Sequence, residues 1–137
     1  MVQLRLVETP LAAFAPVFSD AEERAMQRAV IGLFDRWGLS DAEAAVLLGD
    51  IAPRSFQRWK QGQLGRVGPD LAARLSNLIG IHKALRLLFA EKERGYGWIR
   101  RANTAFGGKS ALDVMLGGQL TDLMRVRRYL DAQRGAW

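Results

Sequence analysis

The residue types that perform most enzyme chemistry are scarce in this chain. Its 137 residues include no cysteine and a single histidine, His82. Without cysteine there is no thiolate nucleophile, disulfide or thiolate metal ligand, and one histidine cannot form a two-histidine metal site. The carboxylates stand mainly at the starts of predicted helices, where capping explains them. We therefore predict that the protein is not an enzyme and uses neither a cofactor nor a metal ion.

Two local patterns suggest chemistry but lack the context for it. Gly108-Lys109-Ser110 resembles the end of a phosphate-binding P-loop, yet that motif needs glycine where Asn103 stands and a strand before it. His82 has the side chain of an acid or base, but its surrounding stretch offers no obvious carboxylate partner. We expect no nucleotide site, and we interpret His82 as an ordinary, partly exposed histidine.

Residue types that contact DNA gather in the middle of the chain. The net charge is +6, and residues 49–101 hold 11 basic and 4 acidic residues, so a polyanion is expected to dock there. Arginine pairs with guanine, glutamine with adenine and serine with either, while lysine binds phosphate. The candidate DNA-binding residues are Arg54, Ser55, Gln57, Arg58 and Lys60. The alternative is an ordinary helical hairpin with an exposed basic face.

The spacing around these residues is typical of a helix-turn-helix. Ala45 is the small residue that lets two helices cross closely, and Gly49 takes the turn position that requires a positive φ. Phe56 and Trp59 are predicted to be buried on the inner side of the second helix. Residues 58–62, RWKQG, resemble the tryptophan-x-x-glycine sequence with which the helix-turn-helix ends in Xre and Cro-like regulators. Asp50 makes the turn one residue longer than that family's usual pattern.

Capping signals and apolar spacing predict an all-α fold. Serine-led capping boxes occur at residues 19–22, 40–43 and 110–113. Only Val2, Leu4 and Leu6 alternate with period two, so at most one short strand or arm is expected. The predicted helices cover residues 19–37, 40–48, 53–61, 69–89, 110–117 and 120–133, with a possible bend at Gly80. Residues 95–108 are predicted to form a loop with one short turn at residues 98–101.

Two C-terminal segments differ in their predicted roles. Residues 103–108 are expected to shape a loop, and the final segment is expected to bind a partner. Asn103 is expected to cap its own loop, Phe106 to fill the core, and Gly107 and Gly108 to allow a tight reversal. The final segment is rich in arginine, tyrosine and tryptophan, the types that dominate binding hot spots. The candidate partner-binding residues are Arg125, Arg127, Arg128, Tyr129, Arg134 and Trp137. The alternative is a helix end with solvated arginines.

Residues 74–85 and 98–113 carry a family resemblance. The runs RLSNLIGIHKAL and WIRRANTAFGGKSALD, followed by a final helix, resemble the MbcA/ParS/Xre antitoxins, and the likeness covers residues 29–137. The resemblance implies a partner toxin with a RES domain, which consumes NAD or transfers its ADP-ribose. It also implies that the C-terminal region grips this toxin near its active-site opening, while the N-terminal half binds the promoter of its own operon.

Residues and resemblance together predict a type II antitoxin. We expect an N-terminal arm at residues 1–18, a DNA-binding helix-turn-helix region at 19–68 and a helical toxin-binding region at 69–137. The protein is expected to be cytoplasmic, without membrane contact, and to form a homodimer, since readers of palindromic DNA usually pair. The alternative is a stand-alone transcriptional regulator whose second half serves dimerisation or sensing.

Overall fold

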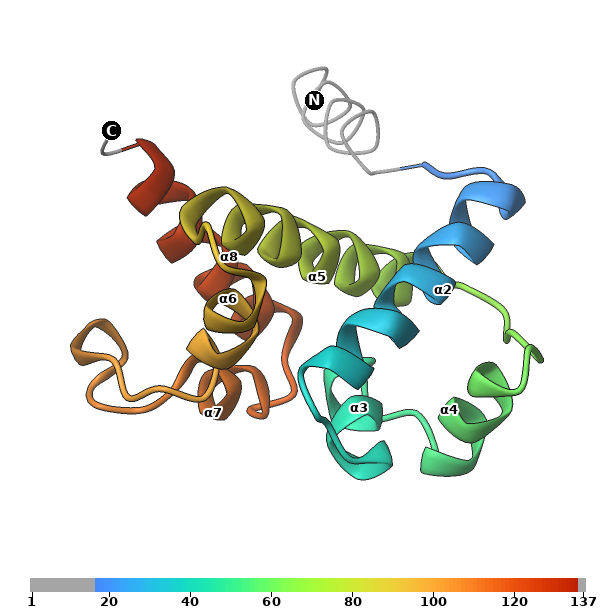
Figure 1. Cartoon of the computed structure of the whole chain (residues 1–137). Coiled ribbons are helices and arrows are strands. Elements are labelled where there is room, and N and C mark those ends of the chain that lie inside the picture. Colours follow the sequence, from blue (N-terminus) through green and yellow to red (C-terminus); the bar gives the residue numbers. More distant parts are fainter. Residues whose placement is uncertain (1–16, 136–137) are drawn as a thin grey trace, which may run out of the picture.

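The fold is all-α, as predicted, in a computed structural model that describes residues 17–135 (Figure 1). Within this range no strand is present, and one isolated antiparallel bridge joins Ala102 to Ser110. The predicted arm falls largely on residues 1–16, which lie outside the described residues. The elements are α2 (Asp20–Arg36), α3 (Asp41–Leu47), α4 (Pro53–Lys60), α5 (Pro69–Leu88), α6 (Lys92–Trp98), η1 (Thr104–Phe106), α7 (Ala111–Met115) and α8 (Leu120–Gly135).

Local capping chemistry sets where three of the helices begin. Ser19, Ser40 and Ser110 each accept the amide of the third residue that follows, and the carboxylate at that position accepts the serine's own amide. Each box satisfies two amides that the helix itself leaves unpaired. The capping boxes read from the sequence are therefore confirmed.

One predicted loop is wrong, because α6 forms where a loop was expected from residue 95. Glycine is a poor helix former, so Gly95 and Gly97 argue against a helix on propensity alone. The helix nevertheless forms, with Gly95 buried against α5, where a Cβ would lie at an ordinary contact distance of 3.5 Å from the Leu85 carbonyl oxygen. The interruption considered at Gly80 is absent, because α5 runs unbroken through that residue.

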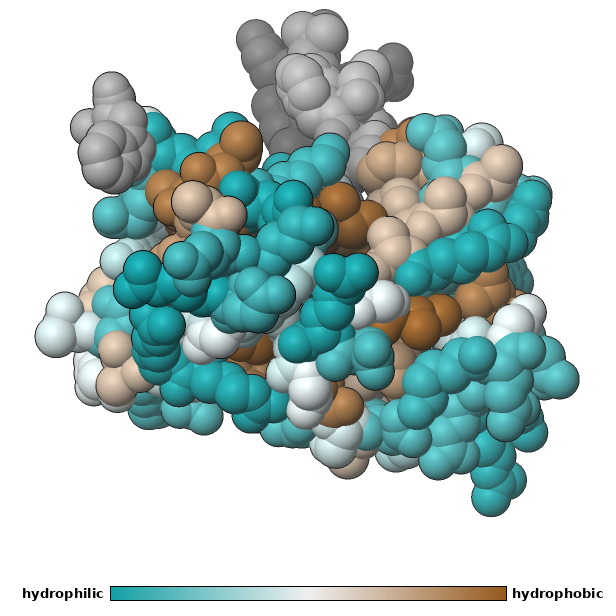
Figure 2. Space-filling view, viewed as in Figure 1, coloured by the Kyte–Doolittle hydropathy of each residue, from teal (hydrophilic) through white to brown (hydrophobic). Residues whose placement is uncertain are grey.

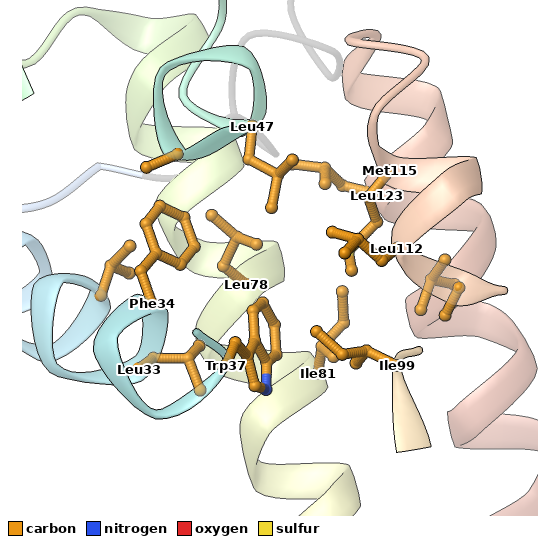
Figure 3. Packing of buried hydrophobic residues seen from close by; sticks show 14 of the residues in the cluster. Leu33, Phe34, Trp37, Leu47, Leu78, Ile81, Ile99, Leu112, Met115 and Leu123 are labelled. Atoms are coloured by element: carbon orange, nitrogen blue, oxygen red, sulfur yellow. The ribbon is translucent and has the colours of Figure 1, made fainter. Parts of the chain in front are cut away.

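The long helix α5 lies at the centre of a single hydrophobic core and contributes buried side chains to it. It packs on α2 and on α8, and the buried side chains between them come from every part of the fold (Figure 3). Leu78 and Ile81 of α5 point toward buried residues of the helices before α5 and of the segments after it. Those neighbours are Leu33 and Phe34 of α2, Trp37 directly after it, Leu47 of α3, Ile99 after α6, Leu112 and Met115 of α7, and Leu123 of α8.

Arg74 on α5 joins three segments through a guanidinium that is almost fully buried. It donates to the carbonyl oxygen of Gly118 at 2.9 Å and to that of Leu47 at 3.4 Å. It also pairs with Asp70 at 2.8 Å, although the Asp70 side chain is 64% exposed. Gly49 keeps this corner open, since a Cβ there would lie 3.1 Å from the Arg74 Nε. Arg74 thereby ties α3 and the α7–α8 connection to α5.

A second polar junction fastens the end of α2 to α6. Arg100 donates to the carbonyl oxygens of Trp37 and Gly38, each at 3.0 Å, and Arg36 donates to the Tyr96 hydroxyl at 2.9 Å. The His82 ring stacks on Tyr96 with centroids 6.1 Å apart and planes 4° from parallel. The half-buried His82 therefore serves as a packing residue, which agrees with its predicted ordinary role.

Replacing Arg74 tests whether the buried carbonyls or the exposed ion pair matter more. We expect Arg74→Ala to lower the free energy of unfolding by roughly 2–4 kcal/mol, because two carbonyl groups lose their donor and the site loses packing. Asp70→Asn should cost less than about 1 kcal/mol, because exposed ion pairs contribute little. Urea denaturation measures both values, and a larger loss for Asp70→Asn would contradict this assignment.

The pKa of His82 gives a second test, because it is the chain's one histidine. Burial, followed by repulsion from Arg86 and Arg36, holds the pKa of His82 below its ordinary value of 6.5. The unfolded chain then takes up the proton first, so stability is lost as pH falls from about 6.5 toward the folded pKa. Proton NMR should give a midpoint below 6.5. His82→Gln should flatten the stability profile in that window, and a raised midpoint would contradict the burial argument.

Candidate nucleic-acid and partner interfaces

The two helices α3 and α4 form a compact hairpin with an unusual turn. Ala45 is 2% exposed and lies inside the hairpin. Gly49 has φ +93°, and the next residue, Asp50, is also left-handed at φ +61°. The Asp50 amide donates to the Ala45 carbonyl oxygen at 2.9 Å and closes the turn. Aspartate tolerates this conformation better than most residues, so the extra turn residue is accommodated without a second glycine.

Two aromatic residues fix which face of α4 is turned outward. Phe56 and Trp59 are 3% and 4% exposed, and the Phe56 ring lies 5.9 Å from that of Phe34 on α2. Packing of this face against α2 leaves the opposite face of α4 to solvent, and the surface over α4 is hydrophilic (Figure 2). The solvent-facing predicted residues are Arg54, Gln57, Arg58 and Lys60, whereas Ser55 is half-buried.

Contacts with Asp41 divide these polar residues into two groups. Lys60 Nζ lies 2.6 Å from Asp41 Oδ1, and Gln57 Nε2 donates to Asp41 Oδ2 at 3.1 Å. The hydrogen bond from Lys60, followed by that from Gln57, lowers the pKa of Asp41 and keeps it ionised. Arg54 and Arg58 make no ion pair within residues 17–135. Sequence spacing alone did not reveal the role of Asp41, because it stands on the other helix of the hairpin.

The C-terminal half carries an aromatic cluster on its surface. Phe106 of η1 meets Tyr129 of α8 edge-on at 5.1 Å, and Trp98 of α6 lies 6.4 Å from Phe106 and 6.0 Å from Tyr129. The Arg125 guanidinium sits 5.3 Å from the centre of the Phe106 ring. Phe106 is buried, but Trp98 and Tyr129 are partly exposed. We call these four residues the aromatic–arginine patch.

The loop that carries Phe106 is held by its own backbone and side chains. Asn103 accepts the Ala105 amide at 2.9 Å, and Gly107 and Gly108 are left-handed, at φ +67° and +86°. The positive φ values turn the chain back toward Ser110, as the glycine pair suggested. Sequence reasoning singled out Phe106 and Tyr129 but missed Trp98, because that residue was assigned to the loop now seen as α6.

The six candidate partner-binding residues do not share one surface. Arg125 and Tyr129 belong to the aromatic–arginine patch, and Arg128 is exposed beside them. Arg127 instead turns toward α5, where it donates to the Ser76 carbonyl oxygen at 3.5 Å across the space left by Gly80. The remaining two are Arg134, which lies 3.7 Å from Asp131, and Trp137, which is outside the described residues.

The described residues give little support to a metal site or a membrane-spanning segment. No group of three histidine, cysteine, aspartate or glutamate side chains is placed to hold a metal ion among the described residues. Within residues 17–135, no helix has the length and apolar content needed to cross a membrane. The geometry therefore directs attention to two surfaces, the outer face of α4 and the aromatic–arginine patch.

Comparison with known families assigns the same two parts of the chain. Residues 17–80 match the model of the antitoxin Xre-like helix-turn-helix domain. Residues 84–135 match the model of the antitoxin Xre/MbcA/ParS C-terminal toxin-binding domain. A protein of Sinorhizobium fredii (strain NBRC 101917 / NGR234), named uncharacterized protein y4oB, is 44% identical over 126 residues, which cover 92% of this chain and 97% of that relative. The chain belongs to the Xre/MbcA/ParS antitoxins, which join a helix-turn-helix to a toxin-binding domain.

Proposed function

We propose that this antitoxin neutralises a cognate RES-domain toxin, which degrades NAD or transfers its ADP-ribose, and that it represses its own operon by binding the promoter. The observation that carries the proposal is the joining of a helix-turn-helix domain and a toxin-binding domain in one chain. The resemblance of residues 98–113 to the MbcA/ParS/Xre antitoxins supports the RES class of partner. In this proposal the antitoxin works by occupying surfaces, without catalysis or a cofactor.

Charge supports an acidic docking surface on the toxin. The toxin-binding domain, residues 84–135, holds ten basic and five acidic residues, a net charge of +5. The helix-turn-helix domain, residues 17–80, holds eight of each and is neutral overall. The excess positive charge thus lies on the toxin-facing part of the chain. A surface with excess positive charge is complementary to an acidic partner surface, which speeds and orients docking.

We infer that the aromatic–arginine patch is the centre of toxin docking, with the α8 arginines at its edge. Trp98 and Tyr129 offer rigid, partly exposed rings, and Arg125 adds a guanidinium held against Phe106. Tryptophan, tyrosine and arginine are the residue types that most often carry interface energy. Arg128, Arg134 and Trp137 extend this proposal along α8 and beyond it, and Arg127 contributes by bracing α8 on α5.

The DNA-binding half is proposed to use the outer face of α4. Arg54 and Arg58 are exposed and carry the base and phosphate contacts in this proposal, with Gln57 and Lys60 beside them. We keep residues 19–68 as the DNA-binding region and 69–137 as the toxin-binding region, with α5 bracing both. A homodimer in the cytoplasm is part of the proposal, because palindromic operators call for paired readers.

Charge reversal in the patch tests the toxin-binding half. The protein is co-purified with the product of the neighbouring gene, and loss of NAD is measured with and without it. We expect Arg125→Glu to weaken the complex at least about tenfold, the size expected for a hot spot, and to restore NAD loss. Arg28→Glu, an equal reversal at an exposed site on α2, should leave the complex intact.

Two results would count against the toxin proposal. No complex and no effect on NAD would favour the alternative, a stand-alone helix-turn-helix regulator that uses its second half for dimerisation or sensing. A tight complex that Arg125→Glu leaves unchanged would keep the antitoxin function but remove the patch from it.

Salt dependence tests the DNA-binding half. We expect Arg58→Ala to weaken binding to a promoter duplex and to reduce the slope of log affinity against log salt by about one, because one phosphate contact is lost. Fluorescence anisotropy at several salt concentrations measures both quantities. Arg128→Ala, in the toxin-binding domain, serves as the control and should change neither. A flat salt response in the unaltered protein would indicate that the hairpin serves subunit contact instead.

A further inference from the structure

We propose that Asp41 competes with DNA phosphate for Lys60 and Gln57 and so limits the affinity of the helix-turn-helix for DNA. This inference rests on the proposed DNA-binding function of α4. It concerns a residue of α3, the helix that precedes the recognition helix. Asp41 thereby acts on DNA through the side chains that it holds.

The geometry gives one carboxylate two partners on the same side of α4. Asp41 Oδ1 lies 2.6 Å from the Lys60 ammonium, and Asp41 Oδ2 accepts from the Gln57 amide at 3.1 Å. Residues three apart on a helix lie on one face, so a single group on α3 can engage both. Lys60 is further held over the Phe56 ring, 5.4 Å from its centre. Two of the four outward-facing residues expected at DNA are thus bound within the protein.

A phosphate that approaches Lys60 meets an ion pair and not a free ammonium group. To bind it, Lys60 must leave an ionised carboxylate, and that carboxylate then repels the incoming phosphate. The Lys60 and Asp41 side chains remain 44% and 28% exposed, so water screens the pair and it can open. Asp41 therefore attenuates DNA binding without abolishing it. Arg54 and Arg58 supply the binding that remains, since neither is paired within residues 17–135.

Neutral overall charge in the helix-turn-helix domain fits this reading. Its eight basic residues are matched by eight acidic ones, so neutralising a single carboxylate changes the net charge of the domain from zero to +1. Asp41 is the acidic residue that makes an ion pair with a candidate DNA-binding side chain in the described part of the chain. Substitution of Asp41 therefore measures directly how far this residue lowers the affinity of the protein for DNA.

The test is Asp41→Asn in the full chain, with DNA affinity measured over a range of salt. Asparagine keeps the size of the side chain and can still accept from Gln57, but it releases the Lys60 charge. We expect affinity to rise by about threefold to tenfold for a promoter duplex and for a scrambled duplex, with the salt slope steeper by about one. Asp35→Asn is the matched control, because Asp35 lines the same hollow as Asp41 and Lys60 without pairing with Lys60.

A double-mutant cycle separates competition from simple charge removal. Lys60→Ala should cost little in the unaltered protein, where Asp41 occupies the ammonium, and about threefold or more in the Asp41→Asn background. A thermal melt of each variant checks that the fold is retained. Equal costs of Lys60→Ala in both backgrounds would overturn the proposal, as would equal gains from Asp35→Asn and Asp41→Asn.

The remaining outcomes distinguish this inference from the function on which it rests. If the unaltered protein binds DNA and Asp41→Asn binds no more tightly, the competition proposal fails while the DNA-binding function stands. Weaker binding by Asp41→Asn would also overturn it and would make Asp41 a residue that positions Lys60 for DNA. If no variant binds either duplex at any salt concentration, both the inference and the DNA-binding half of the proposed function fail.

Discussion

The guanidinium of Arg74 is buried where the helix-turn-helix, the long helix α5 and the connection before α8 meet. It donates hydrogen bonds to the carbonyl oxygen of Leu47, at the end of α3, and to that of Gly118, in the connection between α7 and α8. The two carbonyl hydrogen bonds are the main stabilisation of this buried charge, and the exposed Asp70 adds an ion pair. Arg74 thereby holds the part of the chain that matches the helix-turn-helix domain to the connection before α8.

Helix α5 connects the segments around Arg74 to the rest of the fold, because it packs on both α2 and α8. Its two flanks bury side chains of α2 and of α8, and the Arg36–Tyr96 and Arg100–Trp37 hydrogen bonds close the far side of the same body. A shift of α8 on α5 would therefore change the packing of α5 on α2, and α2 in turn packs on α4 through Phe34 and Phe56. Any coupling between toxin and DNA would have to be reciprocal, with each ligand changing the affinity of the other by the same factor.

Local signals in the sequence predicted much of this fold, and tertiary contacts account for the rest. Serine-led capping boxes, Gly49 and the Phe56–Trp59 spacing are read within a few residues, and the helix starts and the hairpin follow from them. Helix α6 was missed because the low helix propensity of Gly95 and Gly97 favoured a loop, whereas the burial of Gly95 against α5 is a tertiary contact. The Asp41 pair and the diversion of Arg127 to α5 join residues distant in sequence, and no local spacing encodes such contacts.

The single hydrophobic core has a consequence for how the protein unfolds and is degraded. Because side chains of both halves pack into one cluster, neither half has a separate interior that could survive the opening of the other. Unfolding is then cooperative, and a protease that captures the opened chain destroys the whole molecule. Under the proposed function, turnover would release toxin and promoter at the same moment. The amount of intact antitoxin would then set both the restraint on existing toxin and the rate at which more is made.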